Sequence, residues 1–185
     1  MDVLTFKTER LLLRPWKIED AEALYELAQD PRIGPAAGWP THTSVENSRQ
    51  IIKEVLSGKE SYAIVLKGSV NAIGSIGMTF YQRGEEGSRP VEGEIGYWIG
   101  VPYWGRGLVP EAVSELMRHG FEDLGLEAIW CGYFDGNEKS KRVQEKCGFT
   151  YHHTKPDVFC APMNETRVEH FTRITRDEWE NLKHK

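Results

Sequence analysis

The run Trp104-Gly105-Arg106-Gly107-Leu108-Val109-Pro110-Glu111 is the segment that most restricts how this chain can fold. It follows an expected strand over residues 91–99 and opens an expected helix over about residues 108–124, whose apolar residues recur with the helical period. Glycine lets the backbone approach a ligand closely, and the free N–H groups of a helix's first turn favour an anion. Pro110 suits that first turn, and Arg106 adds a fixed positive charge. The run therefore predicts either a turn that grips a phosphate-bearing ligand or a tight turn without a ligand.

The length and composition favour a globular protein. A chain of 185 residues is the size of one domain with a full hydrophobic core, so we expect a single domain over residues 1–185. Hydrophobic residues make up 39% and charged residues 28%, and no apolar stretch is long enough to span a bilayer. The first five residues lack the basic-then-apolar pattern of a signal peptide, so we expect a cytoplasmic protein with no membrane partner.

The net charge and the cysteine content argue against nucleic-acid binders, disulfide-rich proteins and zinc proteins. The net charge of −5 argues against a general nucleic-acid binder and is compatible with a cationic substrate such as an amine. The three cysteines, Cys131, Cys147 and Cys160, are far apart and odd in number, which indicates neither a disulfide framework nor a zinc site. We expect them to be small core residues rather than nucleophiles, and we expect no metal.

Hydrophobic periodicity and turn residues predict the remaining elements. A capping box with Thr43 as the cap and Glu46 reaching back predicts a helix to about Leu56, and Asn137 caps a short helix that ends at Gly148. Residues 30–42 and 82–90 are expected loops, the second a mobile hairpin loop, and residues 175–178 begin a capped tail. The other expected elements are a helix over residues 18–29 and strands over residues 10–16, 62–66, 72–81, 128–134, 150–158 and 166–174.

The glycine-rich run lacks the spacing of a P-loop or of a dinucleotide fingerprint. A second segment, residues 137–149, combines with it to resemble the GCN5-related N-acetyltransferase family. The family's signature before its central helix is Gln/Arg-x-x-Gly-x-Gly/Ala. Gly107 fills the invariant glycine place, whereas Trp104 and Val109 depart at the first and last places. The later segment is similar to the family's Asn-x-x-Ser…Glu-Lys-x-Gly-Phe motif.

The chain is most similar to the RimJ/RimL-type branch, which includes the ribosomal-protein N-terminal acetyltransferases. Residues 8–14, 39–44 and 95–107 resemble that branch's first strand, its loop before the second helix and its central block, and the resemblance covers about residues 8–174. It implies an α/β fold with a central mixed, mostly antiparallel sheet of about seven strands flanked by helices.

The resemblance also implies acetyl-CoA as the co-substrate. In the family the turn before the central helix holds the pyrophosphate, and the pantetheine arm fills a gap where the central strand and its parallel neighbour splay apart. The implied cofactor-binding residues here are Trp98, Ile99, Val101, Trp104, Gly105, Arg106, Gly107, Leu108, Val109, Asn137, Ser140 and Arg142. For Arg142 a solvated helix arginine, and for Asn137 a helix cap, are the alternatives.

Amine acylation by a thioester requires a deprotonated amine and benefits from a donor at the departing sulfur. Glu94 is the candidate general base, acting directly or through a water, and a solvated or ion-paired strand carboxylate is the alternative. Glu92, two residues away on the same strand face, is the reserve candidate. Many family members have a Tyr as general acid where this chain has Gln144, so Ser140 is the candidate donor to the sulfur or else a first-turn cap partner.

Other residues fit less specific roles. His152 and His153 are adjacent, so on a strand their rings are expected on opposite faces, where they cannot easily share a metal. Aromatic residues that line an acceptor pocket or pack in the core are Trp39, Tyr81, Tyr97, Tyr133 and Phe134.

The sequence thus predicts an acetyl-CoA-dependent N-acetyltransferase that works by direct attack. A catalytically silent acyl-CoA-binding or regulatory module, and a transferase for a different acyl-CoA, are the alternatives. The acceptor is expected to be a protein N-terminus or a small-molecule amine, chosen by residues 30–42, 82–90 and 156–165. A monomer and a homodimer both remain open.

Overall fold

The computed structural model describes residues 4–82 and 91–184, and an eight-stranded sheet runs through them. The strands lie in the order β1-β2-β3-β4-β5-β6-β8-β7, and every neighbouring pair is antiparallel except β5 and β6. The mixed, mostly antiparallel sheet is therefore confirmed. The strands are β1 (Phe6–Lys7), β2 (Leu11–Pro15), β3 (Ser61–Leu66), β4 (Ala72–Tyr81), β5 (Glu92–Ile99), β6 (Ala128–Phe134), β7 (Thr150–Cys160) and β8 (Glu165–Thr175).

The expected number of strands was about seven, and the additional strand is β1. It consists of two residues, Phe6 and Lys7, which pair with Leu13 and Leu12 of β2. Two residues are too few to produce a pattern of alternating burial, so periodicity cannot reveal such a strand.

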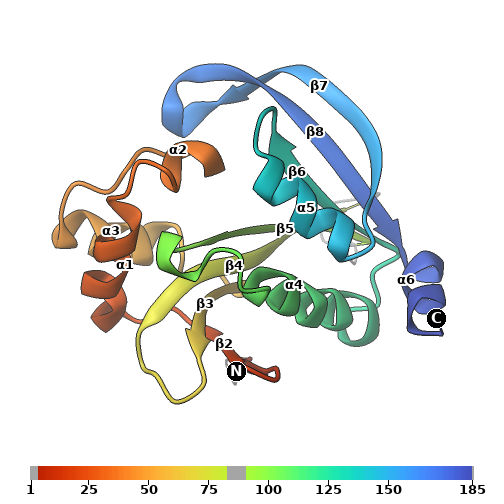
Figure 1. Cartoon of the computed structure of the whole chain (residues 1–185), viewed down its shortest axis with the longest axis horizontal. Helices are drawn as coiled ribbons and strands as arrows, with labels where there is room; N and C mark the ends of the chain where they lie inside the picture. The colour runs from red at the N-terminus through yellow and green to blue at the C-terminus, as the bar shows by residue number, and fades with distance from the viewer. Residues whose placement is uncertain (1–3, 83–90, 185) are drawn as a thin grey trace.

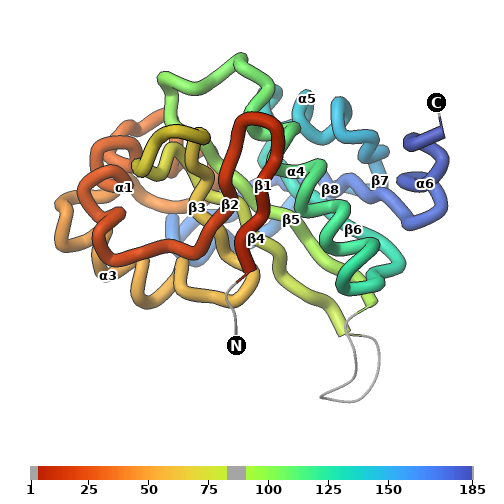
Figure 2. The backbone as a smooth tube through the Cα atoms, turned by 90° about the horizontal axis from the view of Figure 1, so that it is seen from below, coloured from red at the N-terminus to blue at the C-terminus, as the bar shows by residue number. Residues whose placement is uncertain are grey.

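Helices cover both faces of the sheet (Figure 1). Helices α1 and α3 pack on one face and α4 on the other, as the separation of the two groups in Figure 2 also makes clear. The long β7–β8 hairpin arches over α5. The helices are α1 (Ala21–Ala28), α2 (Gly34–Ala37), α3 (Val45–Glu54), α4 (Leu108–Arg118), α5 (Glu138–Lys146) and α6 (Arg176–Lys183). None of the described helices is both long and apolar enough to cross a membrane.

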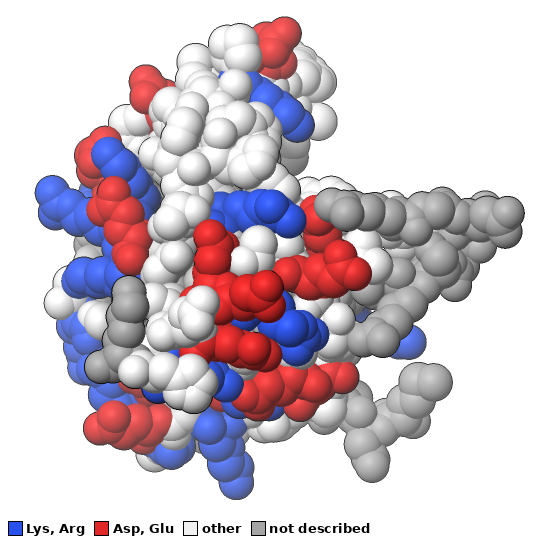
Figure 3. Space-filling view, turned by 90° about the vertical axis from the view of Figure 1, so that its right-hand side faces the viewer, with Lys and Arg blue, Asp and Glu red and all other residues white. Residues whose placement is uncertain are grey.

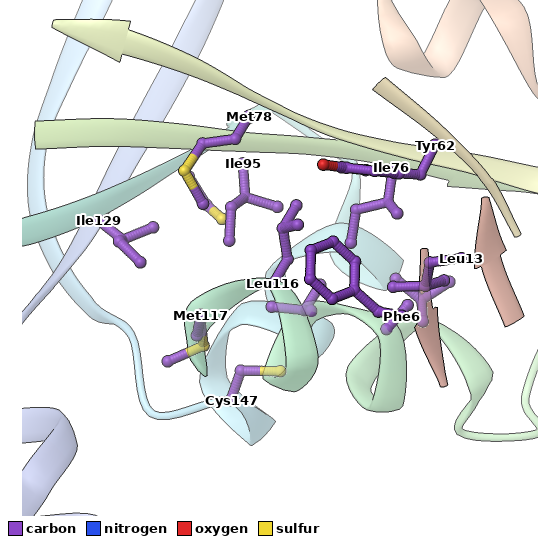
Figure 4. Close-up of a cluster of buried hydrophobic side chains, with 14 of the residues drawn as sticks. Phe6, Leu13, Tyr62, Ile76, Met78, Ile95, Leu116, Met117, Ile129 and Cys147 are labelled. Atoms are coloured by element: carbon purple, nitrogen blue, oxygen red, sulfur yellow. The ribbon is translucent and has the colours of Figure 1, made fainter. Parts of the chain in front are cut away.

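Strand β3 explains why both faces need a cover. Tyr62 and Ile64 are buried in the cluster beneath α4, whereas Ala63 and Val65 are buried in the cluster beneath α1 and α3. A strand buried on both faces is a continuous apolar run, as the sequence of β3 is. The core on the α4 side includes Phe6, Leu13, Tyr62, Ile76, Met78, Ile95, Leu116, Met117, Ile129 and Cys147 (Figure 4).

A short helix, α2, lies within residues 30–42, which the sequence predicted to be a loop. Pro35 occupies its first turn, and Gly38 ends it with φ of 91°. The proline and glycine content that indicated a loop thus marks the two ends of a single helical turn.

The helix termini confirm most of the expected caps. The side chains of Asn137 and Thr175 accept hydrogen bonds from the N–H groups of Ser140 and Glu178, as predicted. The prediction that Thr43 caps α3 is wrong. The cap is Ser44, whose hydroxyl accepts from the N–H of Asn47 at 3.0 Å.

Glu46 therefore does not close the expected capping box. Its carboxylate pairs with Arg49 on the next turn of α3. The helix expected over residues 108–124 is regular only to Arg118 and continues as a π-turn through Asp123.

The expectation for the histidine pair was also wrong. The pairing of β7 with β8 shifts register between Tyr151 and His153, so strict alternation fails at this point. The rings of His152 and His153 lie 5.1 Å apart, with their Nδ1 atoms 2.9 Å from each other, and both contact Trp130. Among the described residues, no group of three or more His, Cys, Asp or Glu residues could hold a metal ion.

The two candidate caps of α3 can be told apart by mutation. Ser44→Ala removes the hydroxyl that accepts from Asn47 and should lower the free energy of unfolding by about 0.5–2 kcal/mol. Thr43→Ala is the matched control and should leave stability within about 0.5 kcal/mol of the wild type. Urea unfolding monitored by circular dichroism measures both, and a larger loss for Thr43→Ala would contradict the assignment.

Candidate active site

A cavity of about 1230 Å³ opens where β5 and β6 part. The two strands pair only from Glu92 opposite Ala128 to Glu94 opposite Trp130. Beyond these residues β5 stays paired with β4, and β6 stays paired with β8. The cavity lies along this parting, with residues 94–99 of β5 on one side and residues 132–134 of β6 on the other. The splay implied by the family resemblance is therefore present.

The glycine-rich turn lies at one end of the cavity and leads into α4. Gly105 and Gly107 have φ of 71° and 72°, a region that side chains other than glycine rarely adopt. A Cβ atom on Gly105 would meet nothing within 4 Å, so its outer side is open. Because the first N–H groups of a helix have no acceptor within it, Leu108 and Val109 present donors here.

Arg10, in the β1–β2 connection, holds this turn through hydrogen bonds that we call the Arg10 brace. Its guanidinium donates to the carbonyl oxygens of Arg106 and Gly107, at 2.9 and 3.3 Å, and to the Glu111 carboxylate at 2.7 Å. The hydroxyl of Thr8 also donates to Glu111, at 2.5 Å. Arg10 thus fixes the position of the turn through its carbonyl groups.

Aromatic and basic side chains flank the turn. The indole N–H of Trp104 donates to the carbonyl of Ile99 at 3.0 Å, which ties the turn to the end of β5. The ammonium of Lys139 lies 3.5 Å from the centre of the Trp104 ring, and the guanidinium of Arg106 lies 5.7 Å from that of Tyr103. With Arg142, these cations give this end of the cavity a positive character.

Glu94 lies in the cavity wall, half-buried on β5. The phenol of Tyr81, on the neighbouring strand, donates to its Oε2 atom. Burial and the Glu94 carboxylate raise the pKa of Tyr81, so the phenol stays protonated and remains a donor. Within the described part of the chain, the other Glu94 oxygen has no hydrogen-bond partner and remains available.

Glu92 has a different environment. It is buried, accepts a hydrogen bond from the indole of Trp130 at 2.8 Å, lies 3.6 Å from Arg173, and does not line the cavity. The reserve candidate is thus engaged in the structure, and the cavity contains the first candidate.

Ser140 belongs to a hydrogen-bonded network on the cavity wall. Its hydroxyl lies 2.9 Å from the Tyr97 hydroxyl and accepts from the amide of Gln144 at 3.2 Å. Gln144 is buried, also donates to the carbonyl of Gly132 and accepts from Thr172 at 2.7 Å. Burial raises the pKa of Tyr97, which keeps its phenol protonated. Gln144 is thus a fixed hydrogen-bonding residue and supplies no dissociable proton.

Asn137 and α2 close another side of the cavity. The Asn137 side chain caps α5 and donates to the carbonyl of Ala36 at 3.3 Å. Arg167 of β8 donates to the carbonyl of Pro35, and the Cys160 thiol contacts the carbonyl of Gly38 at 3.0 Å. The predicted cap role of Asn137 is confirmed, and both ends of its amide are engaged.

Most predicted site residues meet in this one cavity. Trp98, Ile99, Trp104, Gly105, Arg106, Gly107, Leu108, Val109, Asn137, Ser140, Arg142 and Glu94 line it, whereas Val101 does not. Of the aromatic candidates, Tyr97, Tyr133 and Phe134 line the cavity. Trp39 packs against His42 and Trp98, and Tyr81 reaches the cavity only through Glu94. All three cysteines are buried and free, as expected of core residues.

Among the functional residues that sequence reasoning missed are Arg10, behind the glycine-rich turn, and Glu169, in the cavity wall. Arg10 was noted only as part of the first strand, although its pairing with Glu111 spans 101 positions. Glu169 of β8 lines the cavity with no motif around it. A signal for either requires knowing which elements of the fold are neighbours.

The chain matches the family model for the acetyltransferase (GNAT) domain over residues 10–150. This chain belongs to the GNAT acetyltransferases. An N-acetyltransferase of Bacillus licheniformis, p20, is 34% identical over 130 residues, which cover 68% of this chain and 70% of p20. A GNAT-family acetyltransferase from Bacillus anthracis superposes with a TM-score of 0.80 at 24% identity, over 94% of this chain and 99% of that one.

A ribosomal-protein-S5-alanine acetyltransferase from Vibrio fischeri has the same fold. It superposes with a TM-score of 0.69 at 22% identity, covering 95% of this chain and 98% of its own. The predicted GNAT fold, the RimJ/RimL-type resemblance and the acetyltransferase class are confirmed. The names of the relatives favour an acetyltransferase enzyme over a silent binding module.

The Arg10 brace includes the carboxylate of Glu111, and this carboxylate predicts a pH-dependent contribution to stability. Burial opposes ionisation of Glu111, but hydrogen bonds from Thr8 and Arg10 outweigh it and lower the pKa below 4.5. A carboxylate with a lowered pKa stabilises the folded state above that value and loses its contribution as the pH falls through the folded-state pKa. Glu111→Gln should therefore be less stable than the wild type at pH 7, and the difference should shrink below about pH 4.5.

Thermal unfolding between pH 3 and pH 8 measures this difference. Glu46→Gln removes an exposed carboxylate on α3 and serves as the control. A constant difference between Glu111→Gln and the wild type across the range would contradict the role given to the carboxylate.

Proposed function

We propose that the protein transfers the acetyl group of acetyl-CoA to a primary amine by direct attack, without an acetylated enzyme intermediate. The observation that carries this proposal is that one cavity joins an anion-binding turn, a strand gap and an available carboxylate. Acetyl-CoA supplies the activated acetyl group as a thioester when it is bound. The GNAT domain supports this choice of donor, and the cavity residues fit it in three places.

The first place is the turn over residues 104–109. Its positive-φ glycines, the free amides at the start of α4 and the nearby side chains of Arg106 and Lys139 suit a pyrophosphate. Arg142 extends the basic surface along α5 toward a further phosphate. The Arg10 brace supports this role because it binds carbonyl groups that would otherwise repel an anion.

The second place is the gap between the strands. From Ile95 onward the peptide groups on the β6-facing edge of β5 no longer pair with β6, and residues 95–99 line the cavity along this edge, where the carbonyl of Ile99 is already bonded to Trp104. Buried backbone groups of this kind need a partner, and an extended amide-containing arm provides one in the manner of an added strand.

The third place is the reacting end. We propose that Glu94 accepts the proton of the amine, directly or through one water, with the oxygen that Tyr81 does not occupy. Ser140 donates toward the departing sulfur. Because Gln144 donates to the Ser140 oxygen, the hydroxyl hydrogen of Ser140 is left to donate to Tyr97 or into the cavity. Asn137 contributes chiefly by capping α5 and so fixing Ser140.

The acceptor is proposed to be a protein N-terminus or a small-molecule amine. The face in Figure 3 has Asp and Glu side chains gathered in its middle, with Lys and Arg mostly along one edge. That face lacks the continuous basic surface of a nucleic-acid binder, consistent with the net charge of −5. Of the segments expected to select the acceptor, residues 83–90 lie outside the described part of the chain.

Binding of acetyl-CoA tests the donor. Arg106→Glu should weaken acetyl-CoA binding in calorimetric titration by about tenfold or more, because it replaces a phosphate-facing cation with an anion. Arg49→Glu makes the same charge change on the exposed side of α3 and should bind like the wild type. No binding by the wild-type protein would refute the proposed donor, and equal binding by both variants would refute the assigned turn.

The role of Glu94 is tested by the rate of transfer. Glu94→Gln keeps an acceptor for the Tyr81 phenol but removes the base, so kcat should fall by about 10²- to 10⁴-fold with little change in acetyl-CoA affinity. The comparison is Glu92→Gln, which keeps an acceptor for Trp130 outside the cavity. Steady-state assays on a panel of amines measure both, and a loss confined to Glu92→Gln would reverse the assignment.

A further inference from the structure

A second carboxylate, that of Glu169, lies on the cavity wall. Glu169 belongs to β8, where its neighbours in register are Phe134 of β6 and Lys155 of β7. It is half-buried and lines the cavity, and within the described residues its carboxylate makes no hydrogen bond or ion pair. A half-buried acidic group without such partners is unusual, because its desolvation goes uncompensated.

Gly132 of β6 leaves the space that this carboxylate occupies. A Cβ atom on Gly132 would lie 2.5 Å from Oε1 of Glu169, so any larger residue would push the carboxylate aside. Gly132 also lines the cavity just beyond the point where β5 and β6 part. The Glu169 carboxylate therefore lies over the β6 backbone at the reacting end of the cavity.

Glu169 and Glu94 line the same cavity, and their charges act on one another. Burial raises the pKa of Glu169, the Glu94 carboxylate raises it further, and Lys155 opposes both. Burial is the largest cause of the raised pKa of Tyr81, and the carboxylates of Glu94 and Glu169 raise it further. The two carboxylates, Glu94 on β5 and Glu169 on β8, thus influence each other and the Tyr81 phenol on β4. Lys155 of β7 is the cation that offsets the negative charge at Glu169.

We propose that Glu169 is an acceptor-binding residue that receives the ammonium form of the amine between itself and Glu94. This inference rests on the proposed function and deepens it by naming the acceptor class as an amine that is cationic at neutral pH. A cation between the two carboxylates relieves both their mutual repulsion and the desolvation of Glu169.

The reaction balances with this arrangement. The ammonium gives one proton to Glu94 or to its water, and the freed nitrogen lone pair attacks the thioester carbon. The C–N bond forms, the C–S bond breaks, and the thiolate takes up a proton. Glu94 releases the first proton to water and then accepts the second proton of the nitrogen. One of these two protons reaches the thiolate through solvent and the other is released, so the net products are a neutral amide, a thiol and one proton. Glu169 stays ionised throughout and loses its cation when the amide forms, which favours product release.

The acceptor pair benzylamine and aniline tests this inference. Benzylamine is an alkyl amine that is protonated at neutral pH, whereas aniline has a similar ring and is neutral. Glu169→Gln should raise the KM for benzylamine by about tenfold to a hundredfold, the loss expected for a charge-assisted hydrogen bond. The KM for acetyl-CoA should not change, and wild-type enzyme should prefer benzylamine to aniline.

Two further variants separate this role from a structural one. Gly132→Ala displaces the Glu169 carboxylate without removing it and should raise the KM for benzylamine in the same direction. Glu165→Gln, on the exposed start of β8 outside the cavity, removes an equal charge and is the control. If Glu169→Gln keeps the wild-type KM for benzylamine, or if wild-type enzyme prefers aniline, the inference is overturned.

Failure of the inference is distinct from failure of the proposed function. Acetyl-CoA titration and turnover by the wild-type protein report on the proposed function alone. A wild-type protein that binds acetyl-CoA and acetylates benzylamine, beside an unchanged Glu169→Gln variant, would refute only the role of Glu169.

Discussion

The three-residue parallel contact between β5 and β6 is the constraint on which the rest of the site depends. β5 has a long antiparallel partner in β4, and β6 has one in β8. Beyond the contact, β5 and β6 each follow their own partner and separate from one another. The sheet remains continuous because the contact exists, and it opens because the contact ends at Glu94 and Trp130. A longer pairing would fill the gap with backbone hydrogen bonds and leave no room for an extended ligand.

The parting also determines what surrounds the cavity. The residues of β5 just before the split contribute Glu94, and those just after it contribute a free peptide edge. β5 then runs into the turn that starts α4, and Trp104 bonds back to Ile99 to keep this turn beside the strand end. An acidic end and a glycine-rich end with basic side chains nearby are thereby fixed at the two ends of a single strand, with its unpaired edge between them.

Local sequence patterns were sufficient for the features that local physics determines. The apolar run of β3, the caps Asn137 and Thr175 and the glycine-rich turn before α4 were all predicted correctly, because each depends on residues close in sequence. The cap of α3 lies one residue beyond the predicted one, since Thr43 and Ser44 are both good cap residues and the Ser44 hydroxyl is the group that accepts from the N–H of Asn47.

Features that depend on distant residues were not predicted. The contact of Arg10 with Glu111 joins the β1–β2 connection to α4, and the contact of Glu169 with the space beside Gly132 joins β8 to β6; the sequence does not reveal that these elements are neighbours. The histidine pair failed because a register shift in β7 breaks the alternation on which the prediction relied. The candidate residues came from a resemblance and from chemistry, and their common cavity became visible only with the sheet order.

Gln144 shows how a departure from the family pattern can be absorbed. A phenol at this place could release a proton, but an amide with both ends bonded can only hold its neighbours in position. The buried network of Gln144 and Thr172 orients Ser140, and the protonated Tyr97 lies beside it. A thiol leaving group has a pKa of about 8.5, so near neutral pH the thiolate is only modestly basic. Under those conditions an oriented hydrogen-bond donor can stabilise the negative charge on the departing sulfur without transferring its proton. The loss of the dissociable acid therefore does not require the loss of acetyl transfer.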